Sequence, residues 1–255
     1  MRALALPAAI ALSLCLYMPF PSLREKFYQL PARIYAAVKT VFDNKQLDPR
    51  RAPITAALVT GAAAALIAAL HPVLSAIVMA PLFTFSAVMP ACAKMKDELD
   101  SGTYVNDIPT YEAHVRTSCL SLYPAFLHGC FVPLLLVSIG MPLYLGPALG
   151  YLYVVLRALP AENDSTARLI LRIDRAADRF FSAMLVLCAG LVGRNPLRIR
   201  AENAQQRLIR TLGIAGDGTD THAPMAGDIA QGIFVCSFAA GLLCLMLTLV
   251  LLALC

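Results

Sequence analysis

The chain contains 255 residues, of which 59% are hydrophobic and 15% are charged, and its mean hydropathy is +0.68. A soluble domain is about a quarter charged and about half apolar, so the composition excludes an ordinary soluble domain. Several apolar windows approach the roughly 20 residues that a helix needs to cross a bilayer. The sequence therefore predicts an all-α, polytopic bundle of about six spanning helices plus a short re-entrant or interfacial helix. We expect a single integral membrane domain over residues 1–255.

The chain carries a formal net charge of +5. Its basic residues lie in loops between apolar segments, where membrane topology explains them, so membrane lipids are expected partners and nucleic acid is not. Nearly all of the eight cysteines fall inside apolar runs, and no C-x-x-C motif occurs. This pattern is typical of small buried hydrophobic side chains and does not indicate a disulfide framework.

The first segment, MRALALPAAIALSLCLYMPF, is apolar and has no small-x-small cleavage motif after it. We therefore expect an uncleaved first membrane helix. The following segment, Pro21–Ala52, is rich in Lys and Arg and has apolar residues near helical spacing. It is predicted to be an amphipathic helix at the membrane surface. Its basic excess places it in the cytoplasm and the N-terminus outside.

Two apolar hairpins follow along the chain. The first joins Pro53–Leu70 to Val73–Cys92, and the second covers Ser118–Ala158 with a division near Gly140. Small residues in the first hairpin allow close helix contact. The charged segment Lys94–Arg116 lies between the two hairpins and is predicted to be cytoplasmic.

The apolar run Phe180–Gly193 is bounded by arginines and is too short for a spanning helix. If it crossed the membrane, the arginine-rich segment after it would lie outside, against the positive-inside rule. A re-entrant or interfacial helix resolves both objections and makes the loop over residues 194–229 cytoplasmic. The final run, Gln231–Leu254, is long enough to span. The predicted location is therefore the cell (cytoplasmic) membrane, with several crossings.

The stretch LRIDRAADRFFSAM places Arg172, Arg175 and Arg179 on one face of a helix, with Asp174 and Asp178 on an adjoining face. One interpretation is a solvated helix whose arginines contact lipid phosphates. The other is a cationic rim that binds a phosphate-bearing ligand, since the guanidinium fork matches phosphate oxygens. In that reading Asp174 pairs with one of the arginines and fixes its rotamer.

His128 lies inside an apolar segment, where an ionisable residue indicates either function or a hydrogen-bonded packing role. Neither His128 nor the three other histidines has the H-x-x-x-H or H-E-x-x-H spacing of a zinc site. The Gly-rich stretch IAGDGTDTHAPMAGD contains Asp217, Asp220 and Asp228. These carboxylates suit Mg²⁺, but a linker is the favoured interpretation, so no residue is assigned to a metal.

Four stretches resemble the adenosylcobinamide-phosphate synthase family of cobalamin biosynthesis, whose members are integral membrane proteins. They are APLFTFSAVMPACAKMKDELDSG, HGCFVPLLLVSIGMPLYLGPALGYLYVVLRAL, LRIDRAADRFFSAMLVLCAG and PMAGDIAQG. Arg172 and Asp174 match the family's A-R-L-D-D-L run, and Arg175 replaces its second Asp. His128-Gly129 stands where the family has Asp-Gly, and the family's V-G-R-D-T motif is absent.

The resemblance implies condensation of an amino-alcohol with a corrinoid carboxylate, driven by ATP with Mg²⁺, as in an ATP-dependent ligase. His128 and Asp174 are the expected catalytic residues. The shared helical face makes Arg172, Arg175 and Arg179 the expected contacts to a corrinoid or other phosphate-bearing small molecule. Many polar positions of the family are apolar here, so loss of catalysis on a retained scaffold stays open. The alternative is a non-enzymatic membrane sensor or accessory subunit. A small transporter has less support because no internal repeat is visible.

Overall fold

The computed structural model of the chain describes residues 2–17, 21–48, 51–85, 88–102, 107–143, 145–158, 164–192, 204–214 and 223–254. Helices account for nearly all of these residues, and no β-strand occurs among them. The all-α prediction is therefore confirmed. The chain forms two compact units: unit 1 is Met1–Thr84, Val132–Arg175 and Cys244–Cys255, and unit 2 is Phe85–Phe131 and Ala176–Leu243.

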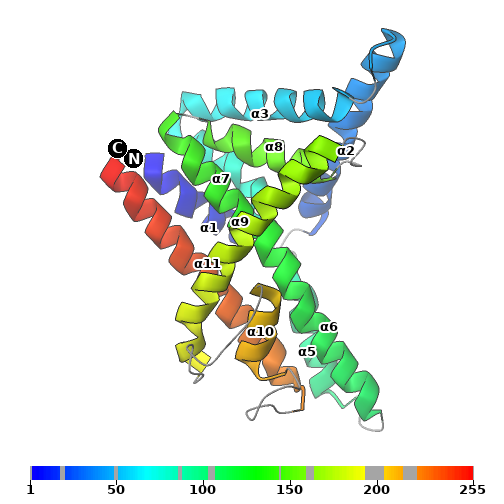
Figure 1. The fold of residues 1–255 in the computed structure, drawn as a ribbon, viewed down its shortest axis with the longest axis vertical. Coiled ribbons are helices and arrows are strands. Elements are labelled where there is room, and N and C mark those ends of the chain that lie inside the picture. Colours follow the sequence, from blue (N-terminus) through cyan, green and yellow to red (C-terminus); the bar gives the residue numbers. More distant parts are fainter. Residues whose placement is uncertain are drawn as a thin grey trace. The chain divides into compact units, whose positions relative to one another are not determined.

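Unit 1 is built around the long helix α3, which runs beside α8 (Figure 1). Its helices are α1 (Ala5–Tyr17), α2 (Pro21–Asn44), α3 (Ala52–Leu70), α4 (Pro72–Met79), α7 (Val132–Gly140), α8 (Gly146–Ala158), the first part of α9 (Asp164–Ala189) and the end of α11 (Ala226–Leu254). The predicted amphipathic segment is indeed helical, as α2. Between α3 and α4 the chain breaks at His71, whose Nδ1 accepts the backbone N–H of Val73 at 3.2 Å. Pro72 then starts α4, as proline favours the first position of a helix.

Small residues bring α3 and α8 into close contact. After its first turn, the buried residues of α3 recur at helical spacing: Ala56, Ala57, Gly61, Ala64 and Ala68. A Cβ placed on Gly61 would lie 2.9 Å from the carbonyl oxygen of Ala148. Only a residue without a side chain allows the two backbones to approach this closely, as is common where membrane helices pack together.

A tight turn joins α7 to α8 and agrees with the division predicted near Gly140. The backbone N–H of Leu145 donates to the carbonyl of Gly140 at 2.8 Å. A Cβ on Gly140 would lie 2.6 Å from the backbone nitrogen of Gly146. The two glycines therefore make the reversal of direction possible.

Unit 2 surrounds an aromatic core. Its elements are α5 (Val88–Asp100), α6 (Ile108–Phe126), the π-helical turn η5 (Leu127–Phe131), the second part of α9, α10 (Ala204–Leu212) and the first part of α11. The rings of Phe131 and Phe181 stack with centroids 4.2 Å apart, and those of Phe85 and Phe126 are 5.2 Å apart. Six of the seven described cysteines are buried and all seven are free, which confirms their prediction as packing residues.

The described residues do not confirm the predicted number of membrane spans. Among the described residues, three helical segments are long and apolar enough to cross a membrane, fewer than the six predicted: Ala52–Leu70, Ile108–Leu143 and Ala226–Leu254. Within the first apolar segment, the described residues 2–17 form the 3₁₀ turn η1 (Arg2–Leu4) and the short helix α1. The expected span Val73–Cys92 is divided into α4, the 3₁₀ turn η3 (Ala80–Leu82) and α5. Proline interrupts it, since Pro81 lacks the N–H that a continuing helix needs.

The segment Phe180–Gly193 is also different from its prediction. Up to Ala189 it is not a separate re-entrant or interfacial helix but the continuation of α9, which begins at Asp164 and has no break before Ala189. The sequence over this range contains neither glycine nor proline, so nothing in it ends the helix at the boundary between charged and apolar residues. The charged stretch and the apolar run are thus one element.

Candidate functional site

A polar group joins α8 to α9 within unit 1. The hydroxyl of Tyr153 donates to Oδ1 of Asp174 at 2.7 Å, and Nη1 of Arg157 donates to Oδ2 at 2.7 Å. Tyr153 is 2% exposed, whereas the side chains of Asp174 and Arg157 are 16% and 38% exposed. The group therefore runs from the protein interior to its surface and ends in a guanidinium that solvent can reach.

The helical repeat explains this arrangement. Tyr153 and Arg157 are four residues apart on α8, so their side chains lie on the same face. Asp174 lies on the inward face of α9, one turn after the half-buried Ile170. Both carboxylate oxygens of Asp174 accept hydrogen bonds, and the bond from Arg157 is charge-assisted, a stronger type than a neutral one. Asp174 can therefore hold the Arg157 side chain in one orientation. The other guanidinium N–H groups of Arg157 can then donate to an anion.

The three predicted arginines and Asp174 lie on different faces of α9, as their spacing in the sequence predicted. Arg172, Arg175 and Arg179 are exposed, whereas Asp174 is half-buried. Around the helix axis, Arg172 lies roughly 160° and Arg175 roughly 100° from Asp174. Arg157 of α8 is an arginine partner of Asp174, and it lies outside the row that we expected to supply one. Arg157 was missed by the sequence analysis, although its spacing from Tyr153 was visible there.

His128 lies in unit 2 together with Arg179, whereas Arg172, Arg175 and Asp174 lie in unit 1. It is half-buried and belongs to the π-helical turn η5, between buried neighbours. Pro133 follows shortly after, and in a regular helix its ring would clash with the carbonyl of Gly129. A wider π turn relieves this clash, and such turns are frequent at functional sites.

A second polar group holds α10 against α9 and α6 in unit 2. The hydroxyl of Tyr123 donates to Oδ1 of Asp178 at 2.9 Å, and the backbone N–H of Ala204 donates to the same oxygen at 3.3 Å. Nε of Arg207 donates to the hydroxyl of Ser182 at 2.7 Å. Asp178 thus accepts a bond from the start of α10, where backbone N–H groups lack helical partners. These contacts give Asp178 a structural role.

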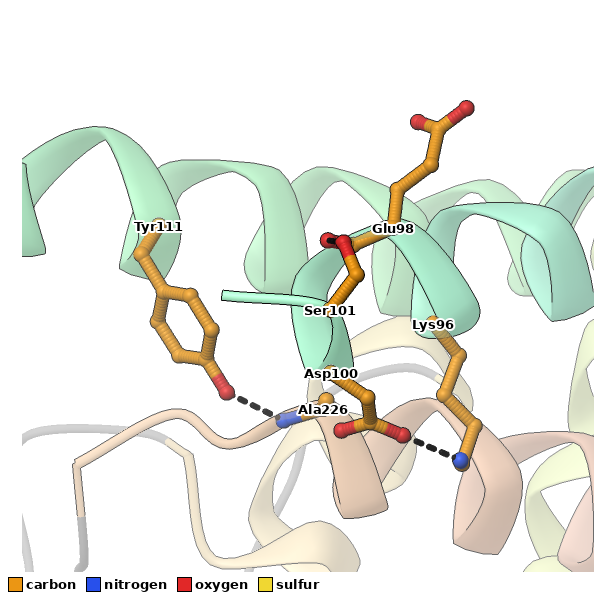
Figure 2. A network of polar contacts seen from close by, with 6 residues as sticks. All are labelled: Lys96, Glu98, Asp100, Ser101, Tyr111 and Ala226. Carbon is orange, nitrogen blue, oxygen red and sulfur yellow. Dashed lines mark hydrogen bonds and ion pairs between the residues drawn. The ribbon is translucent and has the colours of Figure 1, made fainter. Parts of the chain in front are cut away.

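The acidic stretch before the last helix also has a structural role where it is described. Asp228 is buried, and its Oδ2 accepts the backbone N–H of Met225 at 2.8 Å. The hydroxyl of Tyr111 accepts the backbone N–H of Ala226 at 2.9 Å, as Figure 2 shows. Asp228 therefore caps α11, while Asp217 and Asp220 lie outside the described residues.

Two ionised side chains outside the spanning segments are held by local contacts. Lys96 and Asp100 form an ion pair at the end of α5 (Figure 2), and this hydrogen bond raises the pKa of Lys96. At the start of α6, the bonds from Thr110 lower the pKa of Asp107, which caps the helix. Within the described ranges no three His, Cys, Asp or Glu side chains are placed to hold a metal ion.

Comparisons with family models, with curated proteins and with solved structures found no match to this chain.

Proposed function

We propose that this chain is a membrane protein related to the adenosylcobinamide-phosphate synthases, acting in or near cobalamin assembly on a corrinoid carboxylate and an amino-alcohol. Two features support the proposal. The four stretches that resemble the family lie largely in described helices, and three segments have the length and composition of membrane spans. We place the protein in the cell membrane with several crossings, with the spanning segments Ala52–Leu70, Ile108–Leu143 and Ala226–Leu254 among them.

The observation that carries the proposal is the polar group of Tyr153, Asp174 and Arg157. Asp174 matches the family's motif, and both its oxygens hold donors from α8. Arg157 is thereby presented with a fixed orientation, which suits bidentate recognition of phosphate. In this proposal Arg157 contacts a phosphate-bearing ligand, and Asp174 and Tyr153 position it. ATP with Mg²⁺ would supply the activation of the carboxylate if the family's activity is retained.

Growth complementation tests the proposal. The wild-type chain is expressed in a strain that lacks the synthase, with and without added cobinamide. We expect growth without cobinamide for the wild type and for Arg157→Lys to a lesser extent, and none for Arg157→Ala. Immunoblots of the membrane fraction control for expression and insertion. Growth of the wild-type strain only when cobinamide is added would refute the synthase activity.

A non-enzymatic sensor or accessory subunit is the second candidate. It is favoured because several polar side chains hold helices together: Asp178 accepts hydrogen bonds that hold α10, and Asp228 caps α11. On this reading the scaffold binds a corrinoid without converting it. Binding of cobinamide to the purified protein, measured by absorbance titration, together with failed complementation would support this candidate over the enzyme.

A further inference from the structure

The charges of unit 1 are confined to certain segments. No Lys, Arg, Asp or Glu occurs in residues 52–84, 132–156 or 244–255. Exposed basic residues are instead found on α2 and just after it, at the start of α3, at the end of α8 and on the first part of α9: Lys26, Arg33, Lys39, Lys45, Arg51, Arg157, Arg168, Arg172 and Arg175. We call this set the basic end of unit 1. Of these, Arg51 forms an ion pair with the exposed Asp48 at 3.8 Å.

The packing of unit 1 brings these segments together at one end of α3. The first turns of α3 contribute Ala56 and Ala57 to an apolar cluster, and the last turn of α8 contributes Val155 and Leu156. Ile34, Tyr35 and Val38 of α2 and Ile170 of α9 pack against the same cluster. Each of these segments carries basic residues beside its cluster residues. The positive charge therefore lies around the N-terminal end of α3.

The face of α3 that points away from α8 is apolar and exposed. Leu58, Leu66 and Leu70 recur at helical spacing on the side away from α8 and are 55%, 71% and 76% exposed. A contiguous exposed apolar face on a helix of spanning length indicates contact with lipid hydrocarbon. The basic end is then level with the phosphate groups at one surface of the bilayer, while α3 passes through the core.

We propose that the basic end of unit 1 binds the headgroups of anionic phospholipids. The argument is charge complementarity. Arg172 and Arg175 project from the outer side of α9 and are exposed, and guanidinium groups bind phosphate through two parallel hydrogen bonds. Lys and Arg residues next to a spanning helix are attracted to anionic lipid surfaces. Within the basic end, this inference assigns Arg172 and Arg175 to lipid and leaves Arg157 to the soluble ligand. It is therefore independent of the synthase proposal.

The test measures lipid retained by the purified protein. Native mass spectrometry in a neutral detergent is carried out with equal amounts of phosphatidylglycerol and phosphatidylcholine. We expect the wild type to retain more phosphatidylglycerol than phosphatidylcholine. In Arg172→Gln/Arg175→Gln the ratio of the two retained lipids should fall roughly 30-fold, because each basic residue contributes roughly a factor of five to the affinity for an anionic lipid. Arg172→Lys/Arg175→Lys is expected to keep most of it, because the charge is retained.

The control is Lys94→Gln/Lys96→Gln, which removes the same number of charges from unit 2 and is expected to keep the preference. Thermal unfolding in detergent verifies that each variant is folded. Two results would overturn the proposal: equal retention of the two lipids by the wild type, or an unchanged preference in the double glutamine variant. Displacement of the lipid by micromolar inorganic phosphate would overturn it too, because it would identify a soluble phosphate site. Failed complementation with intact lipid preference would refute only the synthase proposal.

Discussion

At the scale of single residues, the hydrogen bonds of α8 differ in kind and should differ in strength. The hydroxyl of Tyr153 donates to the carboxylate of Asp174, whereas that of Tyr151 donates to the backbone carbonyl of Val78 at 2.8 Å. A bond to a charged group is worth about 1.5–3 kcal/mol and a neutral one about 0.5–1.5 kcal/mol. Asp174 is largely buried, so water replaces the lost donor only in part.

We therefore expect Tyr153→Phe to lower the free energy of unfolding by about 2 kcal/mol, and Tyr151→Phe, the matched control on the same helix, by about 1 kcal/mol. Denaturant titration in mild detergent measures both. Equal losses, or a larger loss for Tyr151→Phe, would contradict the importance that we give to the carboxylate contact.

His128 offers a second test at this scale. If the half-buried imidazole acts in catalysis, His128→Ala abolishes complementation and leaves the thermal midpoint of the purified protein unchanged. If it is a packing residue of the π turn, the same change lowers the midpoint and leaves activity per folded molecule intact. The first outcome is our expectation, because His128 stands where the family has an aspartate. His128→Gln keeps a hydrogen-bonding side chain of similar size and serves as the control for packing.

At the scale of elements, the contact between α3 and α8 depends on a missing side chain. A Cβ on Gly61 would meet the backbone of Ala148 at 2.9 Å, and a backbone atom yields only if the whole helix moves. Overpacking of this kind costs about 1–3 kcal/mol. We expect Gly61→Ala to lower the thermal midpoint accordingly.

The matched control is Gly241→Ala in α11. A Cβ at this position meets no heavy atom within 4 Å, and alanine is favoured over glycine in a helix by about 1 kcal/mol. This variant should be as stable as the wild type or more stable. If Gly61→Ala were equally harmless, α3 and α8 would not be in the close contact described above.

The start of α6 gives a pH-dependent prediction. The backbone N–H of Thr110 donates to Oδ1 of Asp107 at 3.1 Å, and the bonds from Thr110 hold the pKa of this carboxyl below its ordinary value. A carboxyl with a lowered pKa stabilises the folded state above its unfolded pKa and loses this effect as the pH falls through its folded pKa.

We accordingly expect the thermal midpoints of the wild type and Asp107→Asn to differ most near pH 7 and to converge below about pH 4. Differential scanning fluorimetry across this range measures the convergence. A constant difference between the two proteins at all pH values would show that the charge of Asp107 has no part in capping α6.

At the scale of the whole molecule, the distribution of basic residues predicts topology. We expect Pro21–Ala52, Lys94–Arg116 and Arg194–Asp228 to face the cytoplasm. The turn between α7 and α8 belongs to the uncharged part of unit 1 and should face outward, and Leu143 in that turn is 70% exposed.

Labelling of single cysteines in intact cells tests this topology, in a background from which the natural cysteines have been removed. A membrane-impermeant maleimide is expected to label Leu143→Cys but not Lys39→Cys, Lys94→Cys or Asn203→Cys. Permeabilised cells provide the control for reactivity, since all four variants should then react. Labelling of Asn203→Cys from outside would overturn the cytoplasmic assignment of the loop after α9.

The sequence by itself determined the class of the fold and the chemical character of its parts. Composition and apolar run length are local properties, so they were sufficient for an all-helical chain, for the amphipathic α2 and for cysteines used in packing. They were not sufficient for the number of spans. A run such as Val73–Cys92 has the hydropathy of one helix, whereas the structure divides it among three elements, with Pro81 at the first interruption.

Only the tertiary structure decided which polar side chains meet. The spacing of Asp174 from the neighbouring arginines favoured an ion pair within α9. In the structure Asp174 lies on the inward face of α9 and contacts Tyr153 and Arg157 of α8. Likewise, Asp178 contacts the start of α10, and Tyr111 contacts the start of α11. Sequence periodicity fixes the face on which a side chain lies, whereas its partner depends on the neighbouring helix, because contacts between distant segments are set by packing.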